Sequence, residues 1–342
     1  MGKTGISVSE VAFGGIPIQT VPRSQAIASV RRALDLGINF IDTARGYTTS
    51  ESIIGHAIKG RGSECVIATK TLARTAKDAQ RDFKASLSFL EISSIDLYQI
   101  HNVNNDEMLT KVVKRGGVLD FIKRLRREGK VHSIGITSHR PSVLMRASNT
   151  GEFDTIMVPL NYVERTPLAE LIPRANKLGI GTIVMKPLGG GAFTNVEDAL
   201  RFVLRQPIST VAVGLRSIEE VEMSAAVGNT PLVLRKNAEK RLENQAKILG
   251  KQFCRACDYC QPCPENIPIS SIARADTYVK RMGWNNWYKN SPRALQKYAN
   301  CRKCRQCEAR CPYELPILDL MEEKVRWVLK HRSEHTPRKS RC

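Results

Sequence analysis

The sequence predicts an α/β fold: a (β/α)8 TIM barrel over residues 1–234, followed by a small, mainly helical domain over residues 235–330. Two observations lead to this prediction. Eight short apolar runs alternate with longer amphipathic runs between Val8 and Val227, and eight of the ten cysteines then fall between Cys254 and Cys311. The 342 residues are enough for one large domain and one small domain.

The eight apolar runs are predicted to be buried strands. Strands that alternate with helices of ten to fifteen residues pair in parallel through crossover connections, and eight such units close into a barrel. An open dinucleotide-binding sheet would carry GxGxxG after its first strand, whereas this chain has AFGGIPI there. The predicted strands cover residues 10–15, 38–43, 65–70, 95–101, 131–138, 153–161, 181–188 and 209–214.

The segments between the strands have the periodicity of amphipathic helices. Clear examples are residues 24–37, 79–91 and 217–228. Several of the predicted helices end at a glycine. We expect a left-handed backbone at these C-terminal positions, which are Gly37, Gly129 and Gly179.

Composition restricts the class of protein. Hydrophobic residues make up 42% and charged residues 25% of the chain, as in ordinary soluble globular proteins. The sequence has no run of eighteen apolar residues and its N-terminus has no secretory signal. We therefore expect a cytoplasmic protein with no membrane partner.

The net charge is +20, and it is unevenly distributed. Residues 235–342 contain 24 Lys and Arg against 11 Asp and Glu, a net charge of +13. Such a balance is typical of proteins that bind nucleic acid, a membrane surface or an acidic protein. Alternatively, bound metal clusters held by thiolates compensate part of the charge locally.

Polar residues at the C-terminal ends of barrel strands are candidates for chemistry. Here they are Asp42, Tyr47 in the loop after it, Lys70 and His101. A phenol has a pKa near ~10, so it is a poor acid at neutral pH unless a buried cation lowers that pKa. We interpret Lys70 as the cation, Asp42 as its anchor and His101 as the group that orients a carbonyl oxygen. Taken singly, each residue also has a plain structural interpretation, such as helix capping.

Three segments, FIDTARGYTTSESIIG, VIATKT and DLYQIH, resemble the signature segments of the aldo-keto reductases. Asp42, Tyr47, Lys70 and His101 fall on the catalytic tetrad of that family, and the resemblance extends from about Lys3 to Val227. It implies an oxidoreductase that transfers a hydride between NADPH or NADH and a small carbonyl or alcohol substrate.

The resemblance also implies a cofactor site, with departures from the common pattern. Ser138 falls near the nicotinamide amide, but His139 replaces the usual asparagine. Met157 stands where a glutamine is usual, which leaves Asn161 as its substitute. Met185 stands where a tyrosine usually stacks on the nicotinamide ring.

Two later segments, VMKPLGGG and VGLRSIEEVE, also occur where that family binds the cofactor. The first implies contacts from Lys186, Leu188 and Gly190. The second segment contains Arg216, and a guanidinium pairs well with the phosphate of a cofactor, which favours NADPH. Glu220, however, stands where a second arginine is usual. The expected phosphate contacts are Arg216 and Ser217.

The cysteines form two runs. The second, CRKCRQCEARCP, has the spacing of bacterial ferredoxins, and the first, CRACDYCQPCP, is one residue shorter at its last gap. CxxC pairs also bind zinc, but two zinc sites would need only pairs, and the Cys-Pro endings are not typical of zinc. We expect two [4Fe–4S] clusters held by Cys254, Cys257, Cys260, Cys263, Cys301, Cys304, Cys307 and Cys311.

In two-cluster ferredoxins, the fourth cysteine of each run ligates the other cluster. By this analogy Cys311 joins the first run and Cys263 joins the second. The segment between the runs has helical patterning, so the ferredoxin-like domain should be helical. The chain thus resembles the aldo-keto reductases with a C-terminal 4Fe–4S ferredoxin-type domain. Residues 331–342 are expected to be a basic, disordered tail.

Three classes of function follow. The first is an oxidoreductase whose clusters pass single electrons to or from an acidic ferredoxin or flavodoxin. A hydride carries two electrons whereas a cluster carries one, and the usual converter between the two is a flavin. The sequence has no flavin motif. Either a bound partner splits the electron pair, or the clusters do not exchange electrons with the nicotinamide. The second is a non-catalytic or self-contained barrel protein whose clusters are structural or bind a partner. The third, a nucleic-acid protein, is disfavoured because the basic residues are interleaved with cluster ligands and only weakly with aromatics, of which Trp284, Trp287 and Tyr288 are the candidates for stacking.

Overall fold

The structure, a computed structural model, describes residues 1–234, 236–256, 258–290 and 293–335. The chain forms two compact units, Met1–Leu242 and Glu243–Cys342. The division lies within helix α10 (Ala238–Gly250), a little beyond the boundary predicted at residue 234.

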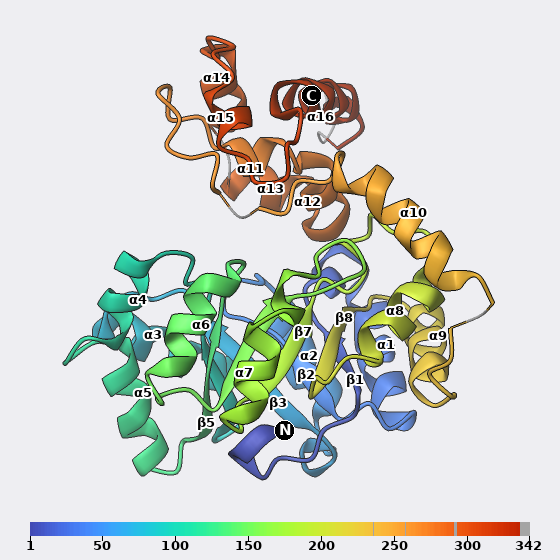
Figure 1. The fold of residues 1–342 in the computed structure, drawn as a ribbon. Coiled ribbons are helices and arrows are strands. Elements are labelled where there is room, and N and C mark those ends of the chain that lie inside the picture. Colours follow the sequence, from blue (N-terminus) through green and yellow to red (C-terminus); the bar gives the residue numbers. More distant parts are fainter. Residues whose placement is uncertain (235, 257, 291–292, 336–342) are drawn as a thin grey trace, which may run out of the picture. The chain divides into compact units, whose positions relative to one another are not determined.

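The first unit is a closed barrel of parallel strands in chain order, surrounded by helices, so the predicted (β/α)8 fold is confirmed (Figure 1). Every predicted apolar run contains a strand. The seventh strand is shorter than predicted because Lys186 has a φ of 58° and ends it. The strands are β1 (Val11–Gly14), β2 (Phe40–Asp42), β3 (Val66–Thr71), β4 (Ile95–Ile100), β5 (Val131–Thr137), β6 (Thr155–Pro159), β7 (Gly181–Met185) and β8 (Thr210–Gly214).

The predicted helices of the barrel are also present. Gly37, Gly129 and Gly179 all have positive φ, as expected at helix C-termini. Two helices rather than one connect β4 to β5. The helices are α1 (Arg23–Asp35), α2 (Ser50–Ile58), α3 (Ala76–Leu90), α4 (Asp106–Val113), α5 (Val118–Arg127), α6 (Pro141–Asn149), α7 (Leu171–Lys177), α8 (Val196–Leu204) and α9 (Ile218–Gly228), with short 3₁₀ turns at Gly2–Thr4, Pro17–Thr20, Gly62–Glu64 and Thr166–Leu168.

The barrel has an apolar interior separate from the layer beneath its helices. Side chains from successive strands fill this interior, among them Phe40, Leu97 and Ile183. Two larger apolar clusters contain most of the buried Val, Ile and Leu of the strands and surrounding helices. The barrel is therefore a packed core, and its polar chemistry is restricted to its ends.

A glycine makes room for a polar side chain near the barrel mouth. Lys70 lies opposite Gln99 in the β3–β4 pair, and Gln99 lies opposite Gly135 in the β4–β5 pair. A Cβ on Gly135 would lie 2.8 Å from Gln99 Cγ and 2.5 Å from Thr155 Oγ1. Its absence lets Gln99 occupy the space beside β5.

In the second unit, the described residues form helices and loops, as predicted for this domain. Its core includes the thiol-bearing side chains of Cys260 and Cys307 beside Ile272 and Met321. The helices after α10 are α11 (Ile269–Ile272), α12 (Ala275–Met282), α13 (Trp284–Asn290), α14 (Ala294–Ala299), α15 (Gln306–Ala309) and α16 (Ile317–His335).

The last helix overlaps the first residues of the tail predicted at residues 331–342. Helix α16 runs to His335, so residues 331–335 are helical rather than part of a tail. Residues 336–342 lie outside the described part of the chain. No helix in the described ranges is both long and apolar enough to span a membrane.

Candidate functional site

The four residues predicted for chemistry meet at the C-terminal end of the barrel. Lys70 and Asp42 are both buried, and Lys70 Nζ donates to Asp42 Oδ2 at 2.6 Å and to the carbonyl of Thr43 at 2.7 Å. Gln99 Nε2 donates to Asp42 Oδ1 at 3.1 Å. Burial raises the pKa of Asp42, while the Lys70 ammonium and the Gln99 amide oppose that rise. Asp42 and Gln99 thus hold Lys70 in one position.

Tyr47 and His101 complete the group. Lys70 Nζ lies 5.2 Å from the centre of the Tyr47 ring, and the Tyr47 and His101 rings pack edge to face with centroids 5.8 Å apart. A cation this close to the phenol favours its ionised form. Tyr47 and His101 are both partly exposed, so they form the solvent-facing side of the group.

His101 is held neutral by its surroundings. Burial lowers the pKa of its imidazole well below the usual value, and the positive charges of Lys70 and Arg74 lower it further. Its Nδ1 is buried and has no hydrogen-bond partner. A neutral imidazole has one N–H donor, which is what orienting a carbonyl oxygen requires.

Arg74 ties the loop after β3 to the loop after β4. Its two terminal nitrogens donate to the carbonyls of Leu72 and Ala73 and to those of His101 and Asn102, at 2.7–3.1 Å. Burial lowers the pKa of Arg74. This residue therefore fixes the backbone that carries His101. The sequence offered no periodic or motif signal for it.

A buried carboxylate anchors the loop that carries Tyr47. Glu51 forms an ion pair with Arg45, and its Oε1 accepts from Thr69 Oγ1 and from Ser86 Oγ, both at 2.7 Å. The Arg45 guanidinium lies 4.4 Å from the ring centre of Phe89. Sequence reasoning missed this network. The available signal was a lone acidic residue at the start of an otherwise apolar helix, SESIIGHAI.

The residues predicted near the nicotinamide amide have protein partners. Ser138 is buried; its hydroxyl donates to Asn104 Oδ1 at 3.0 Å and accepts from Arg140 N at 3.0 Å. A hydroxyl has two acceptor lone pairs, so one remains for a ligand amide. His139 Nδ1 lies 3.0 Å from Asn102 Oδ1, which connects this loop to the loop of His101.

Asn161, predicted as a cofactor contact, has hydrogen-bond partners within the protein. Its Oδ1 accepts from the backbone N–H groups of Val163 and Glu164, and its Nδ2 donates to Glu164 Oε2 and to the carbonyl of Lys186. An asparagine side chain has two acceptor and two donor positions, and all four are occupied. Without a bound cofactor, Asn161 therefore orders the loops after β6 and β7, and its contact with the cofactor stays a prediction. Met157 lies in the barrel interior, as its apolar side chain requires.

The loop after β7 contains the other residues predicted for the cofactor. Lys186 and Gly190 both have positive φ, as do Gly189 and Gly191, so the chain turns sharply here. Leu188 is partly buried against the barrel core. Within this turn Gly189 and Gly190 are buried, and Gly191 is exposed.

Arg216 and Ser217 lie at the start of α9. Ser217 caps the helix by accepting from the backbone N–H of Glu220 at 3.3 Å. Glu220 accepts from the backbone N–H of Arg216 at 2.8 Å and lies 3.5 Å from its Nε. Glu220 therefore competes with a phosphate for the same guanidinium.

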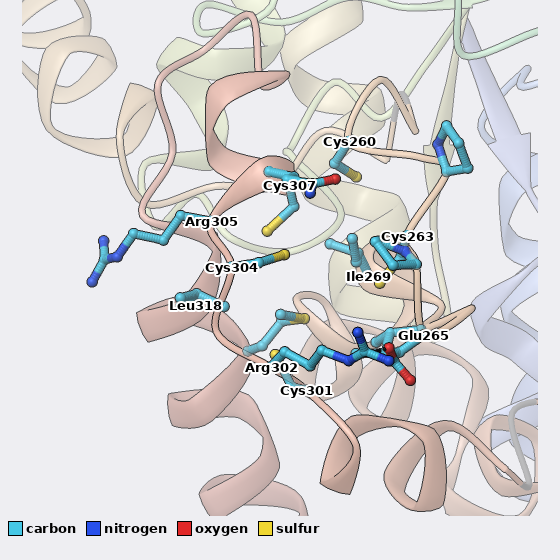
Figure 2. A pocket seen from close by; sticks show the side chains of 15 residues that line it. Cys260, Cys263, Glu265, Ile269, Cys301, Arg302, Cys304, Arg305, Cys307 and Leu318 are labelled. Carbon is cyan, nitrogen blue, oxygen red and sulfur yellow. Dashed lines mark ion pairs between the residues drawn. The ribbon is translucent and has the colours of Figure 1, made fainter.

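In the second unit, the second cysteine run surrounds a cavity of about 100 Å³ (Figure 2). The sulfurs of Cys304 and Cys307 point into this space. No three His, Cys, Asp or Glu side chains in the described ranges converge as a single metal ion would require. The thiols instead border the cavity from two segments far apart in the chain, as Cys260, Cys263, Cys301, Cys304 and Cys307.

A smaller cavity, of about 20 Å³, lies beside the first run. It is lined by Cys254, Cys260 and Cys311, together with Arg255. Cys257, predicted as a ligand here, lies outside the described residues. The Arg255 guanidinium lies 3.8 Å from the ring centre of Tyr313 and donates to the Gly250 carbonyl at 3.1 Å. Each cavity therefore contains thiols from both cysteine runs.

The barrel and its mouth define a class of protein: a (β/α)8 oxidoreductase with a Tyr, Lys, Asp and His group. Residues 10–199 match the aldo/keto reductase family, and residues 253–316 match the 4Fe-4S dicluster domain. The chain belongs to the aldo/keto reductase family and carries a C-terminal 4Fe-4S dicluster domain.

Relatives and solved structures agree with this assignment. L-galactose dehydrogenase of Arabidopsis thaliana is 27% identical over 277 residues, which is 66% of this chain and 86% of the relative. A putative aldo-keto reductase from Pseudomonas aeruginosa is 29% identical, with a TM-score of 0.59, covering 66% of this chain and 93% of that one. An aldo-keto reductase from Klebsiella pneumoniae in complex with NADPH shares the fold at 20% identity, with a TM-score of 0.60 over 70% of this chain and 91% of that one. The chain spans only 60–65% of the length of three other curated relatives.

Proposed function

We propose that the protein exchanges a hydride between NADPH and a small carbonyl or alcohol substrate in the barrel. We further propose that two [4Fe–4S] clusters in the second unit exchange single electrons with an acidic carrier. One observation carries the first part: Tyr47 lies against a buried Lys70–Asp42 ion pair and beside the neutral His101.

The proposed mechanism assigns the proton to Tyr47. The bound nicotinamide supplies the hydride. The Tyr47 hydroxyl donates its proton to the carbonyl oxygen, and the Lys70 ammonium stabilises the phenolate that remains. Asp42 keeps Lys70 in place through the 2.6 Å contact. The His101 N–H donates to the same carbonyl oxygen and orients it.

Cofactor binding is assigned to the loops at the barrel mouth. Ser138 retains one acceptor position for the nicotinamide amide, and the loop of Lys186, Leu188 and Gly190 offers backbone groups nearby. Arg216 and Ser217 are assigned to a cofactor phosphate, which favours NADPH over NADH. The fold relative from Klebsiella pneumoniae was solved with NADPH, in agreement with this choice.

Cluster binding follows the two cavities. Cys301, Cys304 and Cys307 with Cys263 are assigned to one cluster. Cys254, Cys257 and Cys260 with Cys311 are assigned to the other. Mixed cavity linings are what crossed ligation by the fourth cysteine of each run predicts. The donor set suits this group, because [4Fe–4S] clusters are held by cysteine thiolates and cysteines from both runs border each cavity.

The test uses the full chain purified without oxygen. Reduced nicotinamide absorbance should fall when NADPH is added with small aldehydes or ketones, faster than with NADH. Iron and acid-labile sulfide should each approach about eight per chain, as two cubane clusters require. Stoichiometric zinc without sulfide would contradict the cluster assignment. No turnover of any carbonyl or alcohol with either nucleotide, in protein with intact clusters, would favour a non-catalytic barrel.

A further inference from the structure

The two cysteine runs have positive φ at two matching positions. Ala256 and Asp258 in the first run have φ of 56° and 60°, and Lys303 and Arg305 in the second have φ of 53° and 56°. Each pair brackets the second cysteine of its run, Cys257 or Cys304. Since both loops share this rare left-handed conformation at matching positions, differences between them come from their side chains.

The side chains at the matching positions differ in charge. The first loop has Arg255, Ala256 and Asp258, and the second has Arg302, Lys303 and Arg305. The formal charges of these side chains cancel in the first loop and sum to three positive charges in the second. The second loop is therefore more cationic than the loop at the matching position of the first run.

The exposure of the two loops differs in the same direction. Arg255 is only 6% exposed and lies against Tyr313, whereas the side chains of Arg302 and Arg305 are 74% and 68% exposed. Arg305 points away from the cavity (Figure 2). Lys303 is exposed and forms no ion pair among the described residues. The positive charges of the second loop therefore face solvent.

Nearby carboxylates do not cover this charge. Glu265 pairs with Arg302 at 2.6 Å and Glu308 pairs with Arg305 at 2.9 Å. Their side chains are only 21% and 17% exposed, so the guanidinium group is the more exposed partner of each ion pair.

An exposed thiol lies at the centre of the cationic loop. Among the described cysteines, Cys304 is the exposed one, and its sulfur points into the larger cavity (Figure 2). Cys304 is thus both a proposed cluster ligand and exposed to solvent. At the other cavity, Cys254 is partly buried and Cys260 is buried.

From the matched loops, we propose that Cys301–Arg305 is the docking site of an acidic one-electron carrier protein of the ferredoxin or flavodoxin class. The cluster assigned to this loop then exchanges the electron. This proposal rests on the proposed function, in which the clusters are redox-active. The step is balanced: the reduced carrier loses one electron, the oxidised cluster gains it, and no atom is transferred. Cations around the exposed ligand raise the encounter rate with an acidic partner.

The test measures cluster reduction by reduced flavodoxin in a stopped-flow instrument, with the anaerobic full-length protein. The Lys303→Ala, Arg305→Asp double variant converts the second loop to the charges of the first at these positions. The control variant, Arg326→Ala, Lys330→Asp, makes the same change in net charge on later turns of α16, which contribute no residue to the larger cavity. Iron content is measured for each variant, and Lys303→Glu replaces the double variant if that variant loses iron.

We expect the loop variant to react at least about tenfold more slowly at ~0.01 M ionic strength, and the difference to shrink as ionic strength rises above ~0.15 M. The control should differ from the parent by less than about twofold. Reduced methyl viologen is a cation, so the loop variant should react with it at least as fast as the parent.

Other outcomes separate the two proposals. Equal slowing in the loop and control variants would show that only net charge matters and would overturn the docking site. Reduction by methyl viologen but never by flavodoxin or ferredoxin would overturn the carrier. Binding of DNA or anionic vesicles that is lost in the loop variant, with an unchanged flavodoxin rate, would reassign the loop to that ligand. If no reductant reduces intact clusters, the proposed electron exchange itself fails.

Discussion

The barrel and the cluster-bearing unit complete their sites by different means. In the barrel, protein groups satisfy the buried charges: Asp42, Gln99 and a backbone carbonyl hold Lys70. In the second unit, the core contains Cys260 and Cys307, and four further cysteines pack against it around two cavities. From this difference we infer that the barrel folds with its own side chains alone, whereas the second unit folds only with the groups that its thiols bind.

The largest expected effect comes from removing iron. Chelation under mild oxidation should unfold the helices of the second unit and leave the barrel folded, because metal-binding free energy is folding free energy in small metal domains. All three tryptophans, Trp284, Trp287 and Trp327, lie in the second unit, so their fluorescence follows that unit alone. Hydrogen exchange of peptides from β1–β8 follows the barrel. Equal loss of hydrogen-exchange protection in both units would contradict this prediction.

Single cysteine substitutions refine this experiment. Cys257→Ser and Cys304→Ser should each lower iron content and weaken the brown absorbance, each mainly through one cluster. Carbonyl reduction in the barrel should persist in both variants if its site depends only on the barrel.

The next prediction concerns the buried ion pair of the barrel and tests whether protein groups alone stabilise the barrel site. Glu51→Ala leaves Arg45 without its partner and leaves Thr69 and Ser86 without an acceptor. Breaking a buried ion pair usually costs about 3–5 kcal/mol of unfolding free energy. The matched control, Glu222→Ala, breaks a surface pair with Arg32 and should cost at most about 1 kcal/mol. Urea unfolding of the barrel gives both values, and similar losses would refute the anchoring role.

A smaller effect is expected from the proton donor. Tyr47→Phe should reduce turnover by about 10² or more, or roughly 2.7 kcal/mol of transition-state stabilisation, with nearly unchanged cofactor affinity. Lys70→Met should act similarly, because the phenol pKa rises without the cation. Steady-state kinetics and nucleotide titration measure the two quantities. Normal turnover in Tyr47→Phe would eliminate the proposed mechanism.

The smallest effect concerns acid stability. Folding lowers the pKa of His101, so below the unfolded value near ~6.5 the unfolded chain binds a proton that the folded barrel does not. The resulting stability is present above that pH and falls by up to about 1.4 kcal/mol per pH unit below it. His101→Gln should remove this part of the dependence of the unfolding free energy on pH. The control, His132→Gln on an exposed position of β5, should leave it in place. Native-state hydrogen exchange of β3 and β4 peptides from pH 7 to 5 measures it.

The barrel and the proximity of Asp42, Tyr47, Lys70 and His101 at its mouth were predictable because their signals are local. Each strand is a short apolar run, and Asp42, Lys70 and His101 stand where such runs end. Glu51, Arg45 and Arg74 were missed because their partners lie on other elements. The role of Asn161 in ordering the loops was missed for the same reason: its four hydrogen bonds form only where the loops after β6 and β7 meet.

Apolar periodicity and ligand spacing are properties of neighbouring residues, so the barrel and the two cysteine runs could be predicted from the sequence alone. The charges of the loops around Cys257 and Cys304 follow from the sequence as well. Folding buries Arg255 against Tyr313 and leaves Arg302 and Arg305 exposed, which no local pattern indicates. Burial depends on packing between segments distant in the chain, so loops with positive φ at matching positions acquire different surroundings and, in our proposal, different roles.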